Sequence, residues 1–300
     1  MTLSLDAHLS AAITSSSDGE NHISVIPDTL LCNVVSHLPV KDAAHTGALS
    51  HRWRGLWRAT PLALDDAHLL SSSVTTAALV SRVLASHPGP FLAIRITEIP
   101  IDGISTSSAA GLARHFYLGI WLFPFTTDLP RGPDVFPNLQ ELGLCHGITA
   151  ERDLEYVLAC SPKLETLALI SNYGYPDRVR IGSPSLRCVL LWHSLADQVA
   201  AGVTNVCPNT VLPSVKVLAL KVRFRVPKEV RTLLCFLRCF PGVETLHIMA
   251  SNNDTDHYDD PGEVKPGDKL NFTFWKGVGP IKCLKSRVKK LVFDHPIQSS

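Results

Sequence analysis

The chain has 300 residues, of which 45% are apolar and 18% are charged. A disordered chain holds fewer apolar residues, so this composition predicts a folded protein with one large domain or two smaller ones. The net charge is only +1. Near neutrality gives no electrostatic reason to expect nucleic acid or an anionic membrane as a partner, and we expect neither.

Eight cysteines are scattered singly along the chain, which is not the pattern of a disulfide framework. Residues 1–22 have no basic start and no unbroken apolar run, so we expect a flexible leader and no signal peptide. The most apolar window, residues 116–125, is too short for a membrane span. Together these features predict a protein of the cytoplasm, the nucleus or both.

Three short helices are predicted between residues 23 and 61. The first is expected to be capped by Asp28 and to end before Pro39, and its apolar residues recur at helical spacing. A second, weaker helix is expected after Asp42, and a third after Ser50. The third carries an apolar stripe and an outward-facing set of polar residues that includes Arg52. So short a unit buries little surface alone, so it must pack against the rest of the chain or a partner.

The remainder of the chain carries an internal repeat, in which apolar residues follow a proline by two, five and seven positions. The proline-to-proline steps are 25, 22, 29 and 28 residues, within or near the range of leucine-rich repeats. Each copy predicts one short strand, with helical stretches between copies, such as those around Leu154 and Val230. The five copies begin at Pro137, Pro162, Pro184, Pro213 and Pro241, and a sixth at 288–293 lacks the proline.

Stacked repeats of this kind predict an α/β solenoid with parallel strands on its concave face and helices on its convex face. Further strands are expected at 62–64 and 92–96, with a helix between them, which gives six to eight strands in all. The stretches 103–114 and 200–211 look shortened, as if repeat units were missing, and a partial loss would weaken the stack.

Two parts of the sequence resemble plant F-box/leucine-rich-repeat proteins. The first runs from Ile26-Pro27-Asp28 through Leu38-Pro39 to Leu49-Ser50-His51-Arg52-Trp53 and Trp57, and it resembles the F-box itself. The second, from Phe240 to Leu246 and from Leu270 to Leu291, resembles the C-terminal FBD-type segment of the same group. This resemblance predicts an F-box at 23–61 and a leucine-rich-repeat domain at 62–300, with an FBD-type part at about 240–295.

The resemblance implies a substrate-recognition subunit of an SCF-type ubiquitin ligase. In such a complex the F-box binds a Skp adaptor and, through it, a cullin, while the repeats bind a target protein destined for ubiquitin-dependent degradation. The subunit contributes proximity and needs no catalytic residue, metal or cofactor. The residues implied to face the adaptor, or to hold the adaptor-facing helices, are Pro27, Leu30, Leu31, Val34, Leu38, Pro39 and Trp53.

Target binding is expected from side chains between the repeat leucines, although the sequence does not identify the target protein. These residues are Gln140, Glu141, Glu165, Arg187, Lys216 and Lys221. One alternative is a leucine-rich-repeat interaction scaffold with a degenerate F-box that does not bind the adaptor. Another is a metal- or thiol-dependent enzyme, for which Cys235 with Cys239, and Cys145 with His146, offer incomplete sets of ligands or catalytic groups.

Overall fold

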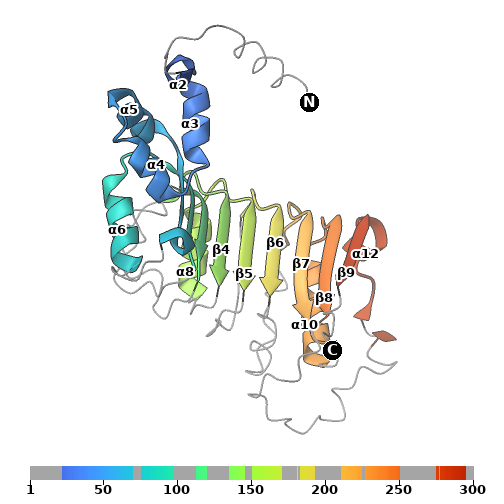
Figure 1. Ribbon diagram of the computed structural model, residues 1–300. Helices are drawn as coiled ribbons and strands as arrows, with labels where there is room; N and C mark the ends of the chain where they lie inside the picture. Colours follow the sequence, from blue (N-terminus) through green and yellow to red (C-terminus); the bar gives the residue numbers. More distant parts are fainter. Residues whose placement is uncertain are drawn as a thin grey trace, which may run out of the picture.

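The computed structural model describes residues 22–69, 76–97, 113–119, 135–145, 151–170, 181, 183–192, 211–224, 227–250, 275–276 and 278–294. It confirms the predicted α/β class, with helices at the N-terminus followed by a sheet of parallel strands (Figure 1). None of the helices in these ranges is both long and apolar enough to cross a membrane. The expected leader lies almost wholly outside the described residues.

Four helices form the N-terminal unit: α2 (His22–Val25), α3 (Asp28–Ser36), α4 (Val40–Thr46) and α5 (His51–Ala59). The predicted cap of α5 is confirmed, because the Ser50 side chain accepts a hydrogen bond from the backbone N–H of Trp53. The predicted caps of α3 and α4 are wrong. Prolines 27 and 39 precede these helices, while Asp28 and Asp42 lie in the first turn, where a carboxylate interacts favourably with the helix dipole.

Within the described residues the sheet holds nine strands in chain order, each parallel to the next. Their bounds are β1 (Leu62–Asp65), β2 (Phe91–Ile96), β3 (Ala113–Leu118), β4 (Glu141–Cys145), β5 (Thr166–Ile170), β6 (Cys188–Trp192), β7 (Val217–Val222), β8 (Thr245–Ala250) and β9 (Lys290–Asp294). The expectation of six to eight strands is therefore wrong by one. Strand β3 was missed because it lacks the repeat proline and carries Phe116 where other repeats carry leucine.

In strands β1 to β8, one face is buried against the helices that follow the strands. The rows of the sheet are in register, so that Leu142, Leu167 and Val189 lie side by side, each at most 1% exposed. Behind them pack η1 (Asp66–Leu69), α6 (Thr76–Ser86), α8 (Glu151–Ala159), α10 (Pro227–Cys239) and α12 (Lys282–Ser286). Successive side chains along a strand alternate between this buried face and the opposite face, and those on the opposite face are half-exposed. The opposite face is the concave face of the solenoid.

The shortened stretches do not interrupt this sheet. Strand β2 pairs directly with β3, and β6 pairs directly with β7, although the segments that join them fall mostly outside the described residues. The predicted weakening of the stack at these two places is therefore not seen in the strand pairing.

The helical unit is joined to the solenoid through a shared core. Val40 and Ala43 of α4 belong to the same buried cluster as Leu62 and Leu64 of β1. At the edge of this junction His87 is 3% exposed, with its ring 4.8 Å from that of Trp57 and 5.2 Å from that of Phe91. Burial lowers the pKa of His87, and the nearby carbonyl groups of Pro90 and Thr60 offset this only in part.

A buried neutral histidine makes stability depend on pH. In the unfolded chain His87 takes up a proton as the pH falls through 6.5, whereas in the folded chain it does so only at a lower pH. Because the unfolded state then binds more protons than the folded state, the free energy of unfolding should fall with the pH. The variant His87→Phe should flatten this slope in denaturant titrations between pH 7.5 and pH 5.5. The exposed control His45→Gln should keep the wild-type slope, and an equal slope in wild type and His87→Phe would contradict the account.

Candidate functional site

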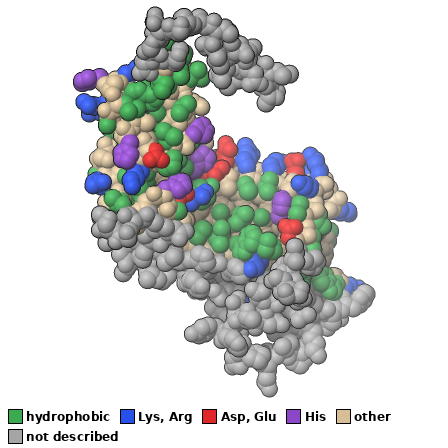
Figure 2. All heavy atoms as spheres, viewed as in Figure 1, with side chains coloured by type: hydrophobic (Ala, Val, Ile, Leu, Met, Phe, Trp, Pro, Cys, Tyr) green, Lys and Arg blue, Asp and Glu red, His purple; other side chains and the backbone are tan. Residues whose placement is uncertain are grey.

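The first candidate surface lies on α3. Leu30 and Val34, one helical turn apart, are 49% and 54% exposed, whereas the next residues, Leu31 and Val35, are 3% and 0% exposed. We call Leu30 and Val34 the α3 face. Figure 2 shows hydrophobic side chains gathered in the region of α2 and α3. Other exposed apolar residues of the unit are Ile23, Val25 and Leu49. Exposed apolar side chains gathered in one region make it a candidate binding surface.

The residues that were predicted to meet or support the adaptor divide into four groups. Leu30 and Val34 form the exposed α3 face, and Leu31 lies in the core. Leu38 and Trp53 are half-buried and pack against the core cluster. Pro27 and Pro39 are exposed and precede α3 and α4.

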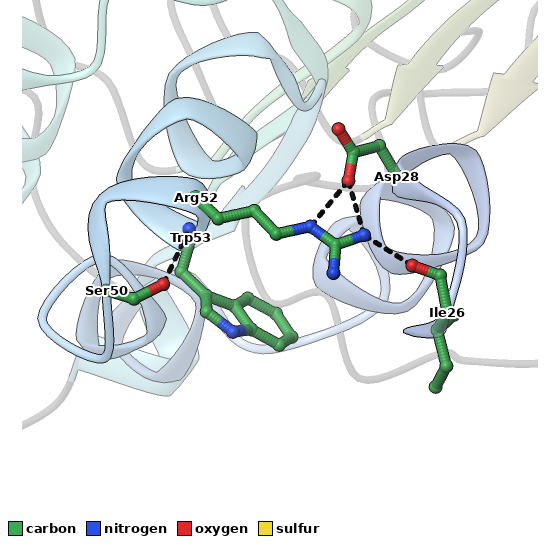
Figure 3. Close-up of polar contacts among 5 residues, drawn as sticks. All are labelled: Ile26, Asp28, Ser50, Arg52 and Trp53. Carbon is green, nitrogen blue, oxygen red and sulfur yellow. Dashed lines mark hydrogen bonds and ion pairs between the residues drawn. The ribbon is translucent and has the colours of Figure 1, made fainter. Parts of the chain in front are cut away.

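A polar contact fixes the start of α3 against α5 (Figure 3). Arg52 donates from Nε to Asp28 Oδ1 at 2.8 Å, and its Nη2 lies 2.6 Å from the same oxygen. The guanidinium also donates to the backbone carbonyl of Ile26. Arg52 was expected to face outward without such a role. Its contacts instead hold α3, and with it Leu30 and Val34, in a fixed position relative to α5.

The second candidate surface belongs to the solenoid, which carries all six predicted target-binding residues. Four of them directly precede a strand, and a ladder of backbone hydrogen bonds joins them at 2.7–2.8 Å. We call this the rim row, and it comprises Gln140, Glu165, Arg187, Lys216, Glu244 and Lys289. Glu244 contacts Lys216 at 3.0 Å and Lys289 at 2.7 Å, and the hydrogen bonds from these two lysines lower the pKa of Glu244 to about 2.

Glu141, the fifth predicted residue, lies on the concave face within a polar cluster. Its Oε2 accepts a hydrogen bond from Tyr117 Oη at 2.5 Å and lies 2.9 Å from His115 Nδ1. Burial and the neighbouring Glu141 raise the pKa of Tyr117 to about 12. Burial alone would raise the pKa of Glu141, but the hydrogen bonds from Tyr117 and His115 outweigh it and lower that pKa. Arg95 lies over the Tyr117 ring and contacts Asp65 at 3.6 Å.

Beyond this polar cluster the concave face becomes apolar. Gly143, Ala168, Leu190 and Ala219 are register partners along one row of the sheet. Tyr117 approaches Gly143 so closely that a Cβ there would lie 2.3 Å from Tyr117 Cδ1. A small residue at 143 is therefore what allows the ring to lie across the strand. The concave face thus combines a polar end near β1 with an apolar middle, which suits binding to another protein.

The sixth predicted residue, Lys221, lies near this apolar middle. Its Nζ is 6.0 Å from the centre of the Trp192 ring, a cation–π geometry at the outer limit of the usual range. Trp192 and Lys221 are both half-exposed on the concave face. On the concave face the sequence did not single out Arg95, His115 and Tyr117, because their strands do not carry proline at the repeat position. In the rim row it did not single out Glu244 and Lys289.

Three of the described cysteines give no support to a thiol enzyme, and the side chain of Cys235 lies outside the described residues. Burial raises the pKa of the Cys145, Cys188 and Cys283 thiols, which is the opposite of what activates a nucleophile. His146 lies outside the described residues. Within the described residues, no group of three or more His, Cys, Asp and Glu side chains is placed to hold a metal ion.

Comparison with known proteins places this architecture in a family. The sequence model of the F-box domain matches residues 23–63, which contain α3 to α5 and all but the first residue of α2. The model described as "FBD-associated F-box protein At5g56370, LRR repeats" matches residues 104–203 and 196–248. The chain belongs to the F-box/leucine-rich-repeat proteins. Curated relatives of this F-box/leucine-rich-repeat protein come from Arabidopsis thaliana.

F-box/LRR-repeat protein At3g26922 is 28% identical over 194 residues, covering 58% of this chain and 60% of the relative. F-box/FBD/LRR-repeat protein At5g53840 is 27% identical over 200 residues, covering 56% of this chain and 44% of the relative. F-box/LRR-repeat protein 13 is 51% identical over 51 residues, or 17% of this chain and 11% of the relative. The chain therefore spans 60% or less of the length of these relatives.

Proposed function

We propose that this F-box protein is the non-catalytic substrate-recognition subunit of an SCF-type ubiquitin ligase. The observation that carries the proposal is the α3 face, where Leu30 and Val34 are about half exposed on a helix whose other side is fully buried. An apolar stripe one turn long, presented on a short bundle, is a surface that a helix of a Skp-type adaptor can cover. The adaptor would link the chain to a cullin.

The solenoid would hold the target protein. Its concave face offers the polar cluster around Glu141 and the apolar row from Gly143 to Ala219, and the rim row borders it with charged side chains. Such a broad face fits a protein partner better than a small molecule, which needs an enclosing pocket. Six described cysteines are free thiols, which agrees with a reducing compartment, so we place the complex in the cytoplasm or the nucleus.

Binding to a purified plant Skp adaptor, measured by calorimetry, tests this function. The double variant Leu30→Asp, Val34→Asp should bind at least about a hundredfold more weakly, because two charges would be desolvated without partners. Its thermal unfolding should stay near that of wild type, since both side chains already face solvent. The matched control Val211→Asp, exposed to 54% beside the solenoid, should bind normally.

Two outcomes would overturn the proposal. If the folded wild-type chain does not bind the adaptor, the scaffold with a degenerate F-box replaces the ligase subunit. If the α3-face variant binds as tightly as wild type, the adaptor is held by another surface. The double variant Leu31→Asp, Pro39→Ala, which the sequence alone would suggest, is a poor probe because Leu31 is a core residue.

A further inference from the structure

Strand β9 ends the described sheet with an apolar layer that is left incomplete. It pairs with β8 on one side, and no strand of the described residues follows it on the other (Figure 1). Leu291 and Phe293 occupy the row that is buried in the other repeats, but they are 61% and 43% exposed. Their register partners in β8, Leu246 and Ile248, are only 1% and 9% exposed. The described part of the sheet therefore ends on a strand with exposed apolar side chains, of which Phe293 also lies with its ring 5.7 Å from that of Phe224.

The sequence of β9 is complementary to itself when it is read in the antiparallel direction. The strand reads Lys290-Leu291-Val292-Phe293-Asp294, so an antiparallel pair centred on Val292 sets Lys290 of each copy opposite Asp294 of the other. The same register sets Leu291 opposite Phe293. Both charged side chains are exposed and lie on the concave side, while both apolar ones lie on the convex side.

The backbone of β9 agrees with this register. Lys290 donates its N–H to the carbonyl of Glu244, toward β8. Because backbone groups of successive residues in a strand point to opposite edges, the N–H and carbonyl of Leu291 point to the outer edge. Leu291 and Phe293 would then form the hydrogen-bonded pairs of an antiparallel ladder, and Lys290 and Asp294 the closer non-hydrogen-bonded pairs.

We propose that β9 pairs antiparallel with β9 of a second copy of this chain, forming a two-fold symmetric dimer whose sheet runs through both solenoids. Charge complementarity favours a second copy over an unrelated strand. An edge lysine normally discourages pairing, because a partner strand rarely offers an acid opposite it. Here the chain itself supplies that acid at the matching position, twice in each dimer. On the convex side, Leu291 of each copy would pack against Phe293 of the other, which would cover the exposed apolar side chains of β9.

Sedimentation velocity of the full chain across a concentration series tests the pairing. One strand pair makes a small interface, so we expect self-association with a dissociation constant of roughly 10 µM to 1 mM. Lys290→Asp and Asp294→Lys should each weaken self-association about tenfold or more, because like charges would then face each other twice. Leu291→Pro should abolish it, since proline removes an outward N–H while leaving the pairing with β8 intact.

Mixing the two charge variants gives the decisive result. A Lys290→Asp chain and an Asp294→Lys chain restore opposite charges at both pairs, so the mixture should associate as heterodimers at concentrations at which each chain alone is largely monomeric. The double variant carrying both changes should regain the wild-type dissociation constant. The control Lys285→Asp alters the net charge equally on the adjacent helix α12 and should leave association unchanged.

The proposal falls if the wild-type chain stays monomeric at millimolar concentration, or if the charge variants associate as wild type does. It also falls if each charge variant is monomeric but the mixture does not associate. In that case the substitutions would have disrupted strand β9 itself, and loss of the Lys290–Asp294 charge pairs would not be the cause. Circular dichroism melts of all variants separate loss of pairing from loss of folding. Adaptor binding by the α3 face is expected to be the same in monomer and dimer, so the two proposals fail independently.

Discussion

Replacing Leu31 by alanine is expected to lower the free energy of unfolding by about 2–5 kcal/mol. The side chain is 3% exposed, and the helices around it are held by the core they share with β1, so the cavity left behind cannot collapse fully. Adaptor binding should fall only in proportion to the unfolded fraction. Chemical denaturation measures the stability, and calorimetry with the adaptor at low temperature measures the binding.

The adjacent residue provides the matched control. Leu30→Ala removes the same atoms from a side chain that is 49% exposed, so stability should change by less than about 1 kcal/mol while adaptor binding weakens. Opposite effects at two adjacent leucines would separate the two sides of α3. If Leu31→Ala weakened binding without lowering stability, the division of α3 into a core side and a binding side would be wrong.

The second large effect is expected at Gly89, where the helical unit meets the solenoid. A Cβ at this position would lie 2.6 Å from the backbone carbonyl oxygen of Arg58 and 2.7 Å from His87 Nε2. The carbonyl belongs to α5, so Gly89→Ala can be accommodated only if the backbone moves and the buried histidine shifts as well. We expect a loss of about 2–3 kcal/mol in the free energy of unfolding.

A second glycine shows what the same substitution does in open space. A Cβ on Gly55 of α5 would meet nothing within 4 Å, so Gly55→Ala should stabilise the chain by up to about 1 kcal/mol through helix propensity. Thermal and chemical denaturation of both variants give the comparison. Equal effects at the two positions would show that the junction at Gly89 is looser than its distances indicate.

The repeat pattern was sufficient to predict most of the fold. The leucines that follow Pro137, Pro162 and Pro184 are buried in one continuous cluster, because a two-residue period places them on the same face of each strand. The pattern failed at β3, where Ala113 and Phe116 occupy positions that carry leucine in the next repeat and no proline marks the turn. There the strand is defined by its pairing with β2 and β4, which are distant in sequence.

The candidate site was predicted less completely than the fold. Helical spacing identifies the apolar residues of α3 but does not tell Leu30 from Leu31, because the difference depends on how α4, α5 and β1 pack around the helix. The contact of Arg52 with Asp28 joins residues from two helices, and no local pattern encodes it. The cluster of Tyr117, His115 and Glu141 likewise exists only because two strands pair in a particular register.

Hydrogen exchange of the full chain with and without a Skp adaptor tests the central claim most directly, because it locates the adaptor on the chain. The account predicts slower exchange in residues 22–49, which carry α2, α3 and α4, and unchanged exchange in strands β4 to β8. Slower exchange confined to the concave strands or the rim row would contradict it. Bound adaptor without any slowing in α3 would contradict it as well.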